Sequence, residues 1–360
     1  MAMKVAATGV AVVLALGGCA AVGGAVVGEG AADESRVQIE CGAGAVAGSG
    51  SSAQASVVNT WIKVYQAACG EATVGYDSVG SGAGVAAFLA GKADFAGSDS
   101  PLSAAEQQRA TERCHGVPAV HLPMVVGPVA LAYNVAGVSE LRLRPATIAR
   151  IFAGTITVWN DPVIVAENPG STLPATRIQT VHRADSSGTT DNFTAFLAAA
   201  AGKDWRYGRG GKWLAPGGTA ARGSNRVATA IARADGAIGY VERSYATFHH
   251  LGAARVGNSS GEFVALTDDA VATTVAGAGN DDLRLGIDYA TASAGAYPIV
   301  LVTYEIICGS GHQPDRLGVL KGFLGYTASA DGQRDAAGAG YVPLPEEVRA
   351  QVATAAAALT

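Results

Sequence analysis

The sequence predicts an α/β fold, and three observations support this prediction. Apolar residues make up 49% of the 360 residues and charged residues only 15%, so the chain can bury a sizeable core. Glycine and proline together account for about 17%, below the roughly 25–30% of disordered or fibrous chains. From about residue 40 onward, short β-branched apolar runs alternate with longer Ala-rich segments of helical spacing, which is the pattern of an α/β domain.

The expected elements alternate along the chain. In the N-terminal part they are a helix through Trp61 and Tyr65, a strand over 74–79, a helix over 84–90 and a long extended run over 119–134. Further on they are a strand over 178–182, a helix over 191–200, strands over 236–242 and 298–307, and a helical pattern over 342–358. Two starts are open for the helix after residue 99: Ser100 as N-cap followed by Pro101, or Ser103 with Glu106 in a capping box.

The N-terminus resembles a bacterial lipoprotein leader. Lys4 is followed by 14 uncharged residues, 5–18, whereas a membrane-spanning helix needs roughly 20. The Leu-Gly-Gly-Cys sequence over 16–19 resembles a lipobox, in which the cysteine is acylated and becomes the new N-terminus. We expect a signal peptide over 1–18, acylation of Cys19 and a flexible tether over 19–39 that holds the protein at the outer face of the cell membrane. The alternative is an ordinary cleaved leader with Cys19 removed or spare, and in both cases the mature protein is extracytoplasmic.

The cysteines predict disulfides and no metal site. Assigning Cys19 to lipid leaves Cys41, Cys69, Cys114 and Cys308, an even number in a compartment that permits two bridges. Four cysteines allow three connectivities, which the sequence does not distinguish; we favour Cys69 with Cys114 and Cys41 with Cys308. No two cysteines have the close spacing of a metal-ligand pair and the six histidines are scattered, so we expect no metal and no cofactor.

The charge pattern excludes one class of partner. Lysine and arginine number 25 against 30 aspartates and glutamates, which gives a net charge of -5, and no run of basic residues occurs. The basic surface typical of nucleic-acid-binding proteins is therefore missing, and we expect no nucleic-acid partner.

Four segments place glycine, serine or threonine where a strand ends and a helix begins: 48–53, 80–84, 96–101 and 183–190. A helix N-terminus offers unpaired N–H groups and a partial positive charge, so each segment is suited to hold an anion. Helix capping explains any one of them without a ligand. On that interpretation Asp99 is an exposed polar residue, and Arg183 pairs with Asp185 in a surface ion pair of little energetic value. Convergence of all four segments predicts one small oxyanion held by many donors.

The same segments carry a family resemblance. The PstS family, the phosphate-binding proteins of bacterial phosphate ABC transporters, has a pattern that appears here in order, as Gly-Ser-Ser-Ala at 50–53, Gly-Ser-Gly-Ala-Gly at 80–84, Asp-Phe-Ala-Gly-Ser-Asp-Ser-Pro-Leu at 94–102 and Arg-Ala-Asp-Ser-Ser-Gly-Thr at 183–189. Segments 237–242 and 297–299 also look familial, and the resemblance spans roughly residues 46–345. The sequence of these segments is most similar to that of the actinobacterial lipoprotein branch of the family.

This resemblance implies an α/β fold of the periplasmic-binding-protein class (type II), with two lobes, a hinge and a ligand cleft between the lobes. Lobe I would comprise residues 40–127 and 295–360, and lobe II residues 128–294. The chain would cross between them around 125–130 and return around 290–297. A ligand that touches both lobes stabilises the closed form through its contacts with each.

The resemblance also implies a set of ligand-binding residues, carried over position by position. Hydroxyl donors would come from Ser52, Ser81, Ser187 and Thr189, and backbone N–H donors from Ala53, Gly188 and Thr189. Arg183 would supply a positive charge, and Asp185 would orient it. The chain departs from the family pattern at Ser52 and Ala53, where Thr-Phe is common, and at 223–226, from which no functional conclusion follows.

Asp99 gives a chemical reason to expect phosphate. A carboxylate facing an anion is unfavourable unless the anion donates a proton to it. Hydrogen phosphate carries such a proton, and sulfate at neutral pH does not. In a desolvated cleft the unpaired acceptor would reject sulfate, and this repulsion would provide specificity.

We therefore expect a monomeric solute-binding protein, not an enzyme, that captures inorganic phosphate and delivers it to the membrane permease subunits of an ABC importer. One alternative changes the ligand to another tetrahedral oxyanion, against which Asp99 argues. Another is a secreted phosphoester hydrolase, but no G-x-S-x-G motif occurs and no histidine suggests a general base near Ser81 or Ser187. A nicotinamide-dependent oxidoreductase rests only on G-x-G-x-x-A over 82–87 and leaves 183–190 unexplained.

Overall fold

The computed structural model describes residues 38–360. The expected signal peptide, Cys19 and most of the expected tether lie outside this range. Within it, none of the helices combines the length and the apolar character that crossing a membrane requires.

A nine-stranded mixed sheet runs through the described part of the chain. Its strands are β1 (Gly44–Gly50), β2 (Ala72–Ser78), β3 (Phe95–Ser98), β4 (Ala119–Asn134), β6 (Gln179–Arg183), β7 (Thr219–Ala221), β8 (Ala237–Glu242), β9 (Gly252–Ala253) and β14 (Val300–Cys308). Their order is β2-β1-β3-β14-β4-β8-β6-β7, and β9 also pairs with β4. β1 is parallel to β2 and β3, whereas β14 is antiparallel to β3 and β4. The strands expected near 74–79, 119–134, 178–182, 236–242 and 298–307 are confirmed.

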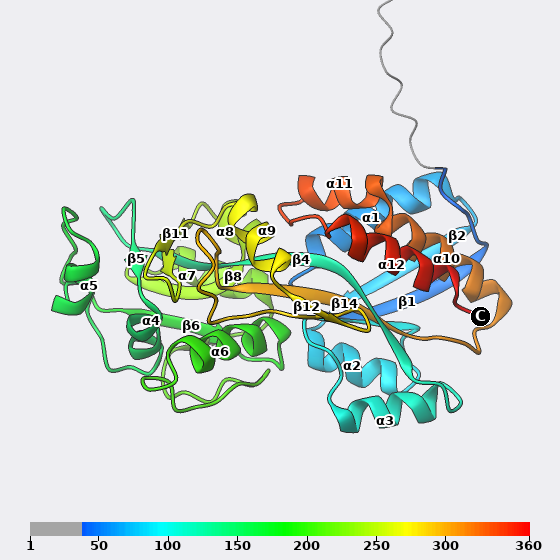
Figure 1. Cartoon of the computed structure of the whole chain (residues 1–360), viewed down its shortest axis with the longest axis horizontal. Helices are drawn as coiled ribbons and strands as arrows, with labels where there is room; N and C mark the ends of the chain where they lie inside the picture. Colours follow the sequence, from blue (N-terminus) through cyan, green and yellow to red (C-terminus); the bar gives the residue numbers. More distant parts are fainter. Residues whose placement is uncertain (1–37) are drawn as a thin grey trace, which may run out of the picture. The chain divides into compact units, whose positions relative to one another are not determined.

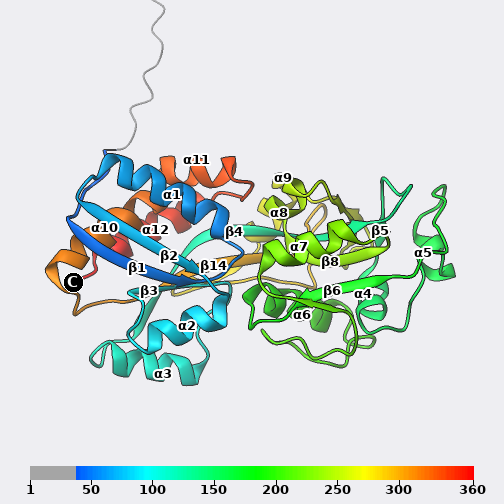
Figure 2. The ribbon, with the colours of Figure 1, turned by 180° about the vertical axis from the view of Figure 1, so that it is seen from behind.

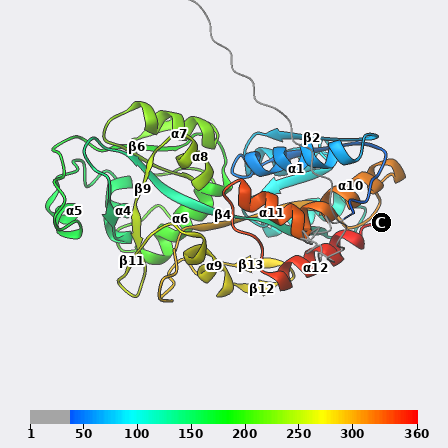
Figure 3. The same cartoon turned by 90° about the horizontal axis from the view of Figure 1, so that it is seen from above.

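β4 joins the two halves of this sheet, and each half is the sheet of one lobe. Residues 119–128 of β4 pair with β14, and residues 129–134 pair with β8. Seen from above, β4 lies between two groups of helices (Figure 3). The pairing with β14 contains an irregularity, because Thr303 pairs with Val125 whereas the next residue, Tyr304, pairs with Pro123. Such a bulge bends a strand and re-aims its side chains.

The first lobe, built on β1, β2, β3 and β14, has helices on both faces of its sheet (Figure 1). One face carries α1 (Ala55–Ala68), α10 (Pro314–Ala328), α11 (Ala330–Gly338) and α12 (Glu346–Ala357), and the other carries α2 (Ser81–Leu89) and α3 (Ala104–Arg113). α1 buries Trp61 and Tyr65, whose four-residue spacing puts them on the same side of the helix. Tyr65 packs edge-on against Phe323 of α10, which also contacts Phe95 of β3. These aromatic contacts join helix and sheet into one core.

The second lobe is built on β8, β6 and β7. α4 (Pro145–Phe152) and α6 (Gly188–Ala200) lie on one face of this sheet, and α7 (Ser224–Arg233) and α8 (Arg243–Phe248) on the other (Figure 2). Its core stacks Phe193 of α6 on Tyr240 of β8, with ring centroids 4.4 Å apart. The remaining elements are α5 (Pro162–Glu167), α9 (Asp268–Ala276), β5 (Arg142–Leu143), β10 (Arg255–Gly257), β11 (Phe263–Val264), β12 (Gly279–Asp281) and β13 (Arg284–Gly286).

The disulfides differ from the favoured pairing. Cys41 is bonded to Cys69 and Cys114 to Cys308, with Cα atoms 5.3 Å apart in each pair. Cys69 ends α1, just before the chain enters β2, and β2 pairs with β1, which begins shortly after Cys41. Cys114 ends α3, and Cys308 ends β14 beside the start of β4. The favoured pairing is therefore wrong. The order of the strands brings the end of α3 to the end of β14, and the spacing of the cysteines in the sequence does not reveal that order.

The helix after residue 99 begins at the second of the two expected starts. Ser103 is the N-cap of α3, and its side chain and that of Glu106 make both bonds of a capping box. The start at Ser100 is wrong. Ser100 Oγ instead donates a hydrogen bond to Asp191 Oδ2 of α6 at 2.7 Å, and so links the two lobes.

Candidate functional site

Three of the four glycine- and serine-rich segments leave the sheet at one edge. β1, β2 and β3 run parallel to one another, so the loops after Gly50, Ser78 and Ser98 start from the same side. In open α/β sheets, ligands bind at the carboxyl ends of the strands. The fourth segment follows β6 in the second lobe.

The segment after β6 touches the loops of the first lobe directly. The Gly188 N–H donates to Ser81 Oγ at 3.1 Å, and the Gly82 N–H donates to the carbonyl of Ser186 at 3.2 Å. Only glycine fits at position 188 without a shift, because a Cβ there would lie 2.4 Å from Asp99 Cβ and 2.8 Å from Ser81 Oγ. The structure therefore brings these segments of the two lobes into contact.

Arg183 and Asp185 form a buried ion pair at this contact. Nε of Arg183 donates to Asp185 Oδ1 at 2.8 Å and Nη2 donates to Oδ2 at 2.5 Å, and the arginine is only 2% exposed. Burial by itself lowers the pKa of Arg183, but the hydrogen bonds and charge of Asp185 outweigh it and the net shift is upward. Burial raises the pKa of Asp185, and Arg183 outweighs this effect and lowers it overall. The surface-ion-pair interpretation is wrong, and Arg183 keeps its charge.

The opposite edge of the Arg183 guanidinium faces hydroxyl groups. Nη1 donates to Thr189 Oγ1 at 3.4 Å and to Ser224 Oγ at 3.3 Å. Both distances exceed the usual 2.7–3.2 Å of N–H···O hydrogen bonds, so this edge is held more loosely than the edge on Asp185. Ser52 reaches the same place from the first lobe, since its Oγ lies 3.1 Å from Ser224 Oγ and accepts the Ser224 N–H at 3.1 Å.

Asp99 lies beside these hydroxyls and is 3% exposed. Its Oδ1 accepts a hydrogen bond from Thr303 Oγ1 at 2.8 Å, and its Oδ2 lies 3.3 Å from Ser81 Oγ and 3.4 Å from Thr189 Oγ1. Burial raises the pKa of Asp99, although hydroxyl hydrogen bonds and the charge of Arg183 oppose the shift. The interpretation of Asp99 as an exposed polar residue is therefore wrong. We refer to Ser52, Ser81, Asp99, Arg183, Thr189 and Ser224 as the polar cluster.

Two of the expected donors have local partners in the structure. Ser187 is the N-cap of α6, and its Oγ accepts the Thr190 N–H at 3.2 Å. The Ala53 N–H donates to Ser51 Oγ at 3.0 Å. For these two positions the structure shows the local hydrogen bonding that helix starts favour.

Ser224 and Glu242 were not among the expected site residues. Ser224 begins α7 after Gly223, whose φ of 75° favours glycine, so it repeats the glycine–serine signal of the other loops. Glu242 is the last residue of β8, has no exposed surface, and its Oε1 accepts a hydrogen bond from Thr189 Oγ1 at 2.8 Å. A glutamate at the end of a buried apolar strand was the available signal for this position.

Thr303 and Asn192 also lie at the site without a recognisable motif. Thr303 sits within the apolar run of β14, and its role depends on the register of that strand. Asn192 Nδ2 donates to the backbone carbonyls of Asp99 and Gly188, both at 2.8 Å. Asn192 thus bridges the two lobes from one turn inside α6.

A pocket of about 370 Å³ adjoins the polar cluster. Asp99, Asn192, Arg209 and Arg284 are among the residues that line it. Arg209 is paired with Asp191 at 2.7 Å. Two arginines beside such a pocket favour the approach of an anion. Among residues 38–360, no group of histidine, cysteine, aspartate and glutamate side chains could hold a metal ion.

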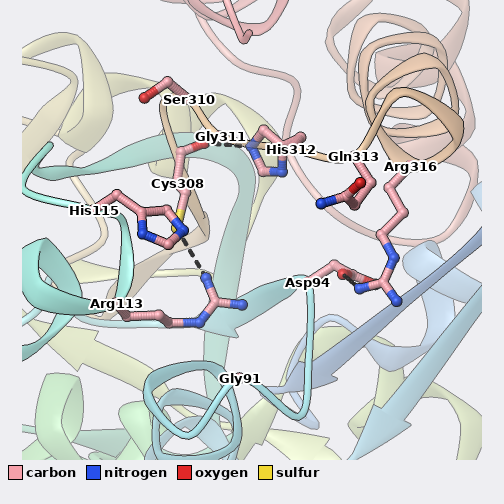
Figure 4. A pocket seen from close by; sticks show the side chains of 10 residues that line it. All are labelled: Gly91, Asp94, Arg113, His115, Cys308, Ser310, Gly311, His312, Gln313 and Arg316. Carbon is pink, nitrogen blue, oxygen red and sulfur yellow. Dashed lines mark hydrogen bonds and ion pairs between the residues drawn. The ribbon is translucent and has the colours of Figure 1, made fainter.

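A second pocket, of about 220 Å³, lies in the first lobe beside the bond between Cys114 and Cys308 (Figure 4). Its polar groups are largely engaged by the protein itself. Arg113 donates to Cys308 Sγ at 2.9 Å and to the Ala93 carbonyl at 2.7 Å, and Arg316 is paired with Asp94 at 2.7 Å. This pocket therefore lacks the arrangement of loosely held donors that the polar cluster has.

The comparisons with known proteins agree with this fold. Residues 35–331 match the model of the PBP superfamily domain. The fold is similar to that of a solved phosphate-binding protein from Stenotrophomonas maltophilia, at 22% identity and a TM-score of 0.71, covering 86% of this chain and 93% of that one. It is also similar to a high-affinity periplasmic phosphate-binding protein (PfluDING) solved with bound phosphate, at 25% identity and a TM-score of 0.69, with the same coverage. The chain is thus a two-lobed binding protein of the PBP superfamily.

Curated relatives narrow the family. Phosphate-binding protein PstS 3 of Mycobacterium tuberculosis is 42% identical over 347 residues, which cover 94% of this chain and 91% of the relative. The PstS 3 protein of Mycobacterium leprae is 39% identical over 352 residues, covering 96% and 95%. The chain belongs to the PstS family, and the mycobacterial relatives confirm the resemblance to its actinobacterial branch.

Proposed function

We propose that this protein binds inorganic phosphate between its two lobes and delivers it to the permease subunits of an ABC importer, without chemical conversion of the ligand. The observation that carries the proposal is the pairing, in one buried site, of a loosely held guanidinium edge with a buried carboxylate acceptor. Arg183 supplies charge, the hydroxyls of Ser52, Ser81, Thr189 and Ser224 supply hydrogen bonds, and Asp99 accepts a hydrogen bond from the protonated oxygen of hydrogen phosphate. Relatives at about 40% identity are named as phosphate-binding proteins, which supports this ligand.

We place the lobe boundaries at residues 40–127 and 295–360 for lobe I and 128–294 for lobe II. The change of pairing partner on β4, from β14 up to residue 128 to β8 from residue 129, supports the first crossing. β14 begins at Val300, shortly after the second. Hydrogen bonds across this boundary, such as Ser81 with Gly188 and Ser52 with Ser224, support closure of the lobes around the ligand.

We further propose that the mature protein is a monomer outside the cytoplasm, held at the outer face of the cell membrane by a lipid on Cys19. The Leu-Gly-Gly-Cys sequence at 16–19 and the glycine-rich segment that follows it support this proposal. Mass spectrometry of protein from the native membrane tests it. A mature N-terminus at Cys19 with an added acyl mass is expected, and an unmodified N-terminus downstream of Cys19 contradicts it.

Isothermal titration calorimetry with phosphate and sulfate at pH 7 tests the ligand. We expect saturable binding of phosphate and strong discrimination against sulfate, because sulfate has no proton for Asp99. Equal affinity for the two anions contradicts the phosphate assignment. Small-angle X-ray scattering with and without phosphate tests closure, and an unchanged radius of gyration at saturation contradicts it.

A further inference from the structure

Glu242 is a buried carboxylate in contact with the polar cluster whose role the proposed function leaves open. It ends β8, has no exposed surface, and its Oε1 accepts a hydrogen bond from Thr189 Oγ1 at 2.8 Å. Its other oxygen, Oε2, is buried and has no hydrogen-bond partner among residues 38–360. A buried carboxylate with a hydrogen bond to only one of its oxygens is costly to ionise, so the neutral acid is favoured. Its protonation state determines whether it accepts a hydrogen bond from its neighbour or donates one.

The contacts of Thr189 limit what its hydroxyl can do. A hydroxyl has one hydrogen to donate and can accept from other donors. Glu242 Oε1 at 2.8 Å is a much closer acceptor for that hydrogen than Asp99 Oδ2 at 3.4 Å, and Arg183 Nη1 donates to the same oxygen at 3.4 Å. While Glu242 is ionised it therefore holds the Thr189 hydrogen, and Thr189 presents only lone pairs to an anion in the polar cluster.

We propose that Glu242 is a proton-linked positioning residue that takes up one proton when phosphate binds and thereby makes the Thr189 hydroxyl a donor to the anion. The added proton resides on the Glu242 carboxyl group and is donated to Thr189 Oγ1. The hydrogen of Thr189 is then free to rotate toward a phosphate oxygen. This inference rests on the proposed function, since it concerns the same site and ligand.

The charges around Glu242 favour this linkage. Burial raises the pKa of Glu242, the charge of Asp99 raises it further, and Arg183 acts in the opposite direction. Tyr245 of α8 and Tyr341, which precedes α12, also interact with its charge. A phosphate anion beside Thr189 adds negative charge and so shifts the equilibrium further toward the neutral acid. Protonation of Glu242 and binding of phosphate then promote each other.

The linkage has a definite sign. A group whose pKa is higher in the complex than in the free protein supports binding at low pH and supports it less as pH rises through that range. Phosphate affinity of the parent protein should therefore fall with rising pH relative to a variant that is always neutral at this position. Glu242→Gln is such a variant, because its amide can donate to Thr189 Oγ1 at every pH. The limiting slope for one proton is about tenfold per pH unit.

The experiment compares dissociation constants for phosphate in the parent protein and Glu242→Gln from pH 6.5 to 9. Ionisation of phosphate is common to both proteins and cancels in the ratio of the two constants. We expect the ratio of parent to variant to rise with pH, by up to about tenfold per unit. In a Thr189→Val background, which lacks the hydroxyl, the same substitution should give a ratio that rises clearly less steeply with pH, because only the charge of Glu242 then acts on the anion. A ratio that is flat with pH, or that rises equally without the Thr189 hydroxyl, overturns the proposal.

Glu305 provides a matched control. It is also buried, its Oε2 also lacks a hydrogen-bond partner in the described residues, and burial raises its pKa to about 7. Hydrogen bonding from Gln54 opposes that shift, and no hydrogen bond joins Glu305 to Thr189 in the described structure. Glu305→Gln should leave the ratio to the parent constant within about twofold. An equal pH dependence in Glu305→Gln assigns the effect to buried charge in general and contradicts a specific role for Glu242.

A measurement on the parent protein alone guards against misfolding of the variants. Calorimetry at pH 8 in two phosphate-free buffers of different ionisation enthalpy gives the number of protons taken up per phosphate bound. Free phosphate is then almost entirely hydrogen phosphate and contributes little. We expect uptake of a fraction of a proton up to one, and zero uptake overturns the proposal. Absence of phosphate binding by the parent contradicts the proposed function instead, so the two failures are distinguishable.

Discussion

Arg183 in the polar cluster is buried, Arg113 in the pocket of Figure 4 is half-buried, and the protein holds the two guanidinium groups in different ways. Asp185 holds one edge of Arg183 with two short hydrogen bonds, while the other edge has only long contacts to hydroxyls. Arg113 stacks on the ring of Phe88, and its two terminal nitrogens donate hydrogen bonds to Cys308 Sγ and to the Ala93 carbonyl. Burial lowers the pKa of Arg113, with Asp94 opposing, whereas the net shift at Arg183 is upward.

The difference shows what an anion site needs beyond a positive charge and a pocket. A carboxylate on one edge keeps the guanidinium charged and fixes its orientation, and a loosely occupied second edge remains available to exchange its partners. Positive charge alone does not distinguish the two sites, because the pocket beside Arg113 also contains arginines and histidines. The arrangement of partners around the guanidinium distinguishes them. The same contrast defines the substitutions that test the site.

The largest expected effect is at Arg183. Arg183→Gln removes the charge and leaves Asp185 buried without its partner, beside the anion. Removing one partner of a buried, hydrogen-bonded charge contact with a ligand costs about 2–5 kcal/mol of binding free energy, so phosphate affinity should fall by at least roughly 30-fold in calorimetry. Arg113→Gln is the matched control and should change affinity by less than about twofold. Thermal unfolding of both variants separates loss of binding from loss of folding, and similar losses of affinity in the two would contradict the distinction drawn here.

The second effect concerns selectivity. Asp99→Asn replaces an acceptor with an amide that can donate to a fully ionised anion. An unpaired buried acceptor costs about 1–3 kcal/mol, so the ratio of phosphate to sulfate affinity should fall by roughly 5- to 150-fold. Asp94→Asn, in the pocket of Figure 4, should leave that ratio unchanged. Competition binding with the two anions measures the ratio, and an unchanged ratio in Asp99→Asn would remove the basis for phosphate specificity.

A smaller loss of phosphate affinity is expected at Gly188, whose backbone packs against Asp99. In Gly188→Ala the new methyl group would lie 2.4 Å from Asp99 Cβ, so Asp99 or the start of α6 must move. Overpacking of this kind costs about 1 kcal/mol or more, and phosphate affinity should fall about fivefold. Gly91→Ala in the other pocket meets no atom within 4 Å but has a φ of 69°. It should lower the free energy of unfolding by about 1 kcal/mol and leave affinity unchanged.

The smallest effect on affinity is expected from the disulfide beside Arg113. Replacing Cys114 and Cys308 with alanine opens a link between residues 194 positions apart and should lower the free energy of unfolding by about 2–5 kcal/mol. Phosphate affinity at 25 °C should change by less than about twofold. Denaturant unfolding and calorimetry on the same sample test both statements. A large loss of affinity would show that the two regions are coupled.

Most strands could be predicted because they are buried and rich in β-branched residues. The run over 119–134 has the same bounds as β4, and the strand near 178–182 agrees with β6 to within one residue. The neighbours of each strand could not be predicted in the same way. β14, from late in the chain, lies between β3 and β4, and this long-range pairing also decides the connectivity of the cysteines.

The site shows the same division between local and long-range information. The loops carrying Ser52, Ser81 and Arg183 have a local signal, because glycine and serine mark helix starts at strand ends. Thr303 and Glu242 lie on strands and gain their contacts from the register of the sheet. No spacing in the sequence encodes that register. Asp99 could therefore be predicted from its loop, but its partner Thr303 and the second carboxylate, Glu242, could not.

The bulge at Met124 of β4, opposite Thr303 and Tyr304 of β14, has a consequence for how the chain length of related proteins can vary. Thr303 meets Asp99 where the register against β4 changes, and a shift of one residue turns a strand side chain to the opposite face. Insertions or deletions in β4 or β14 would therefore break this contact even if the surrounding core repacked. Homologues of different size should carry their extra residues in connections such as 201–218 and keep the lengths of these two strands fixed.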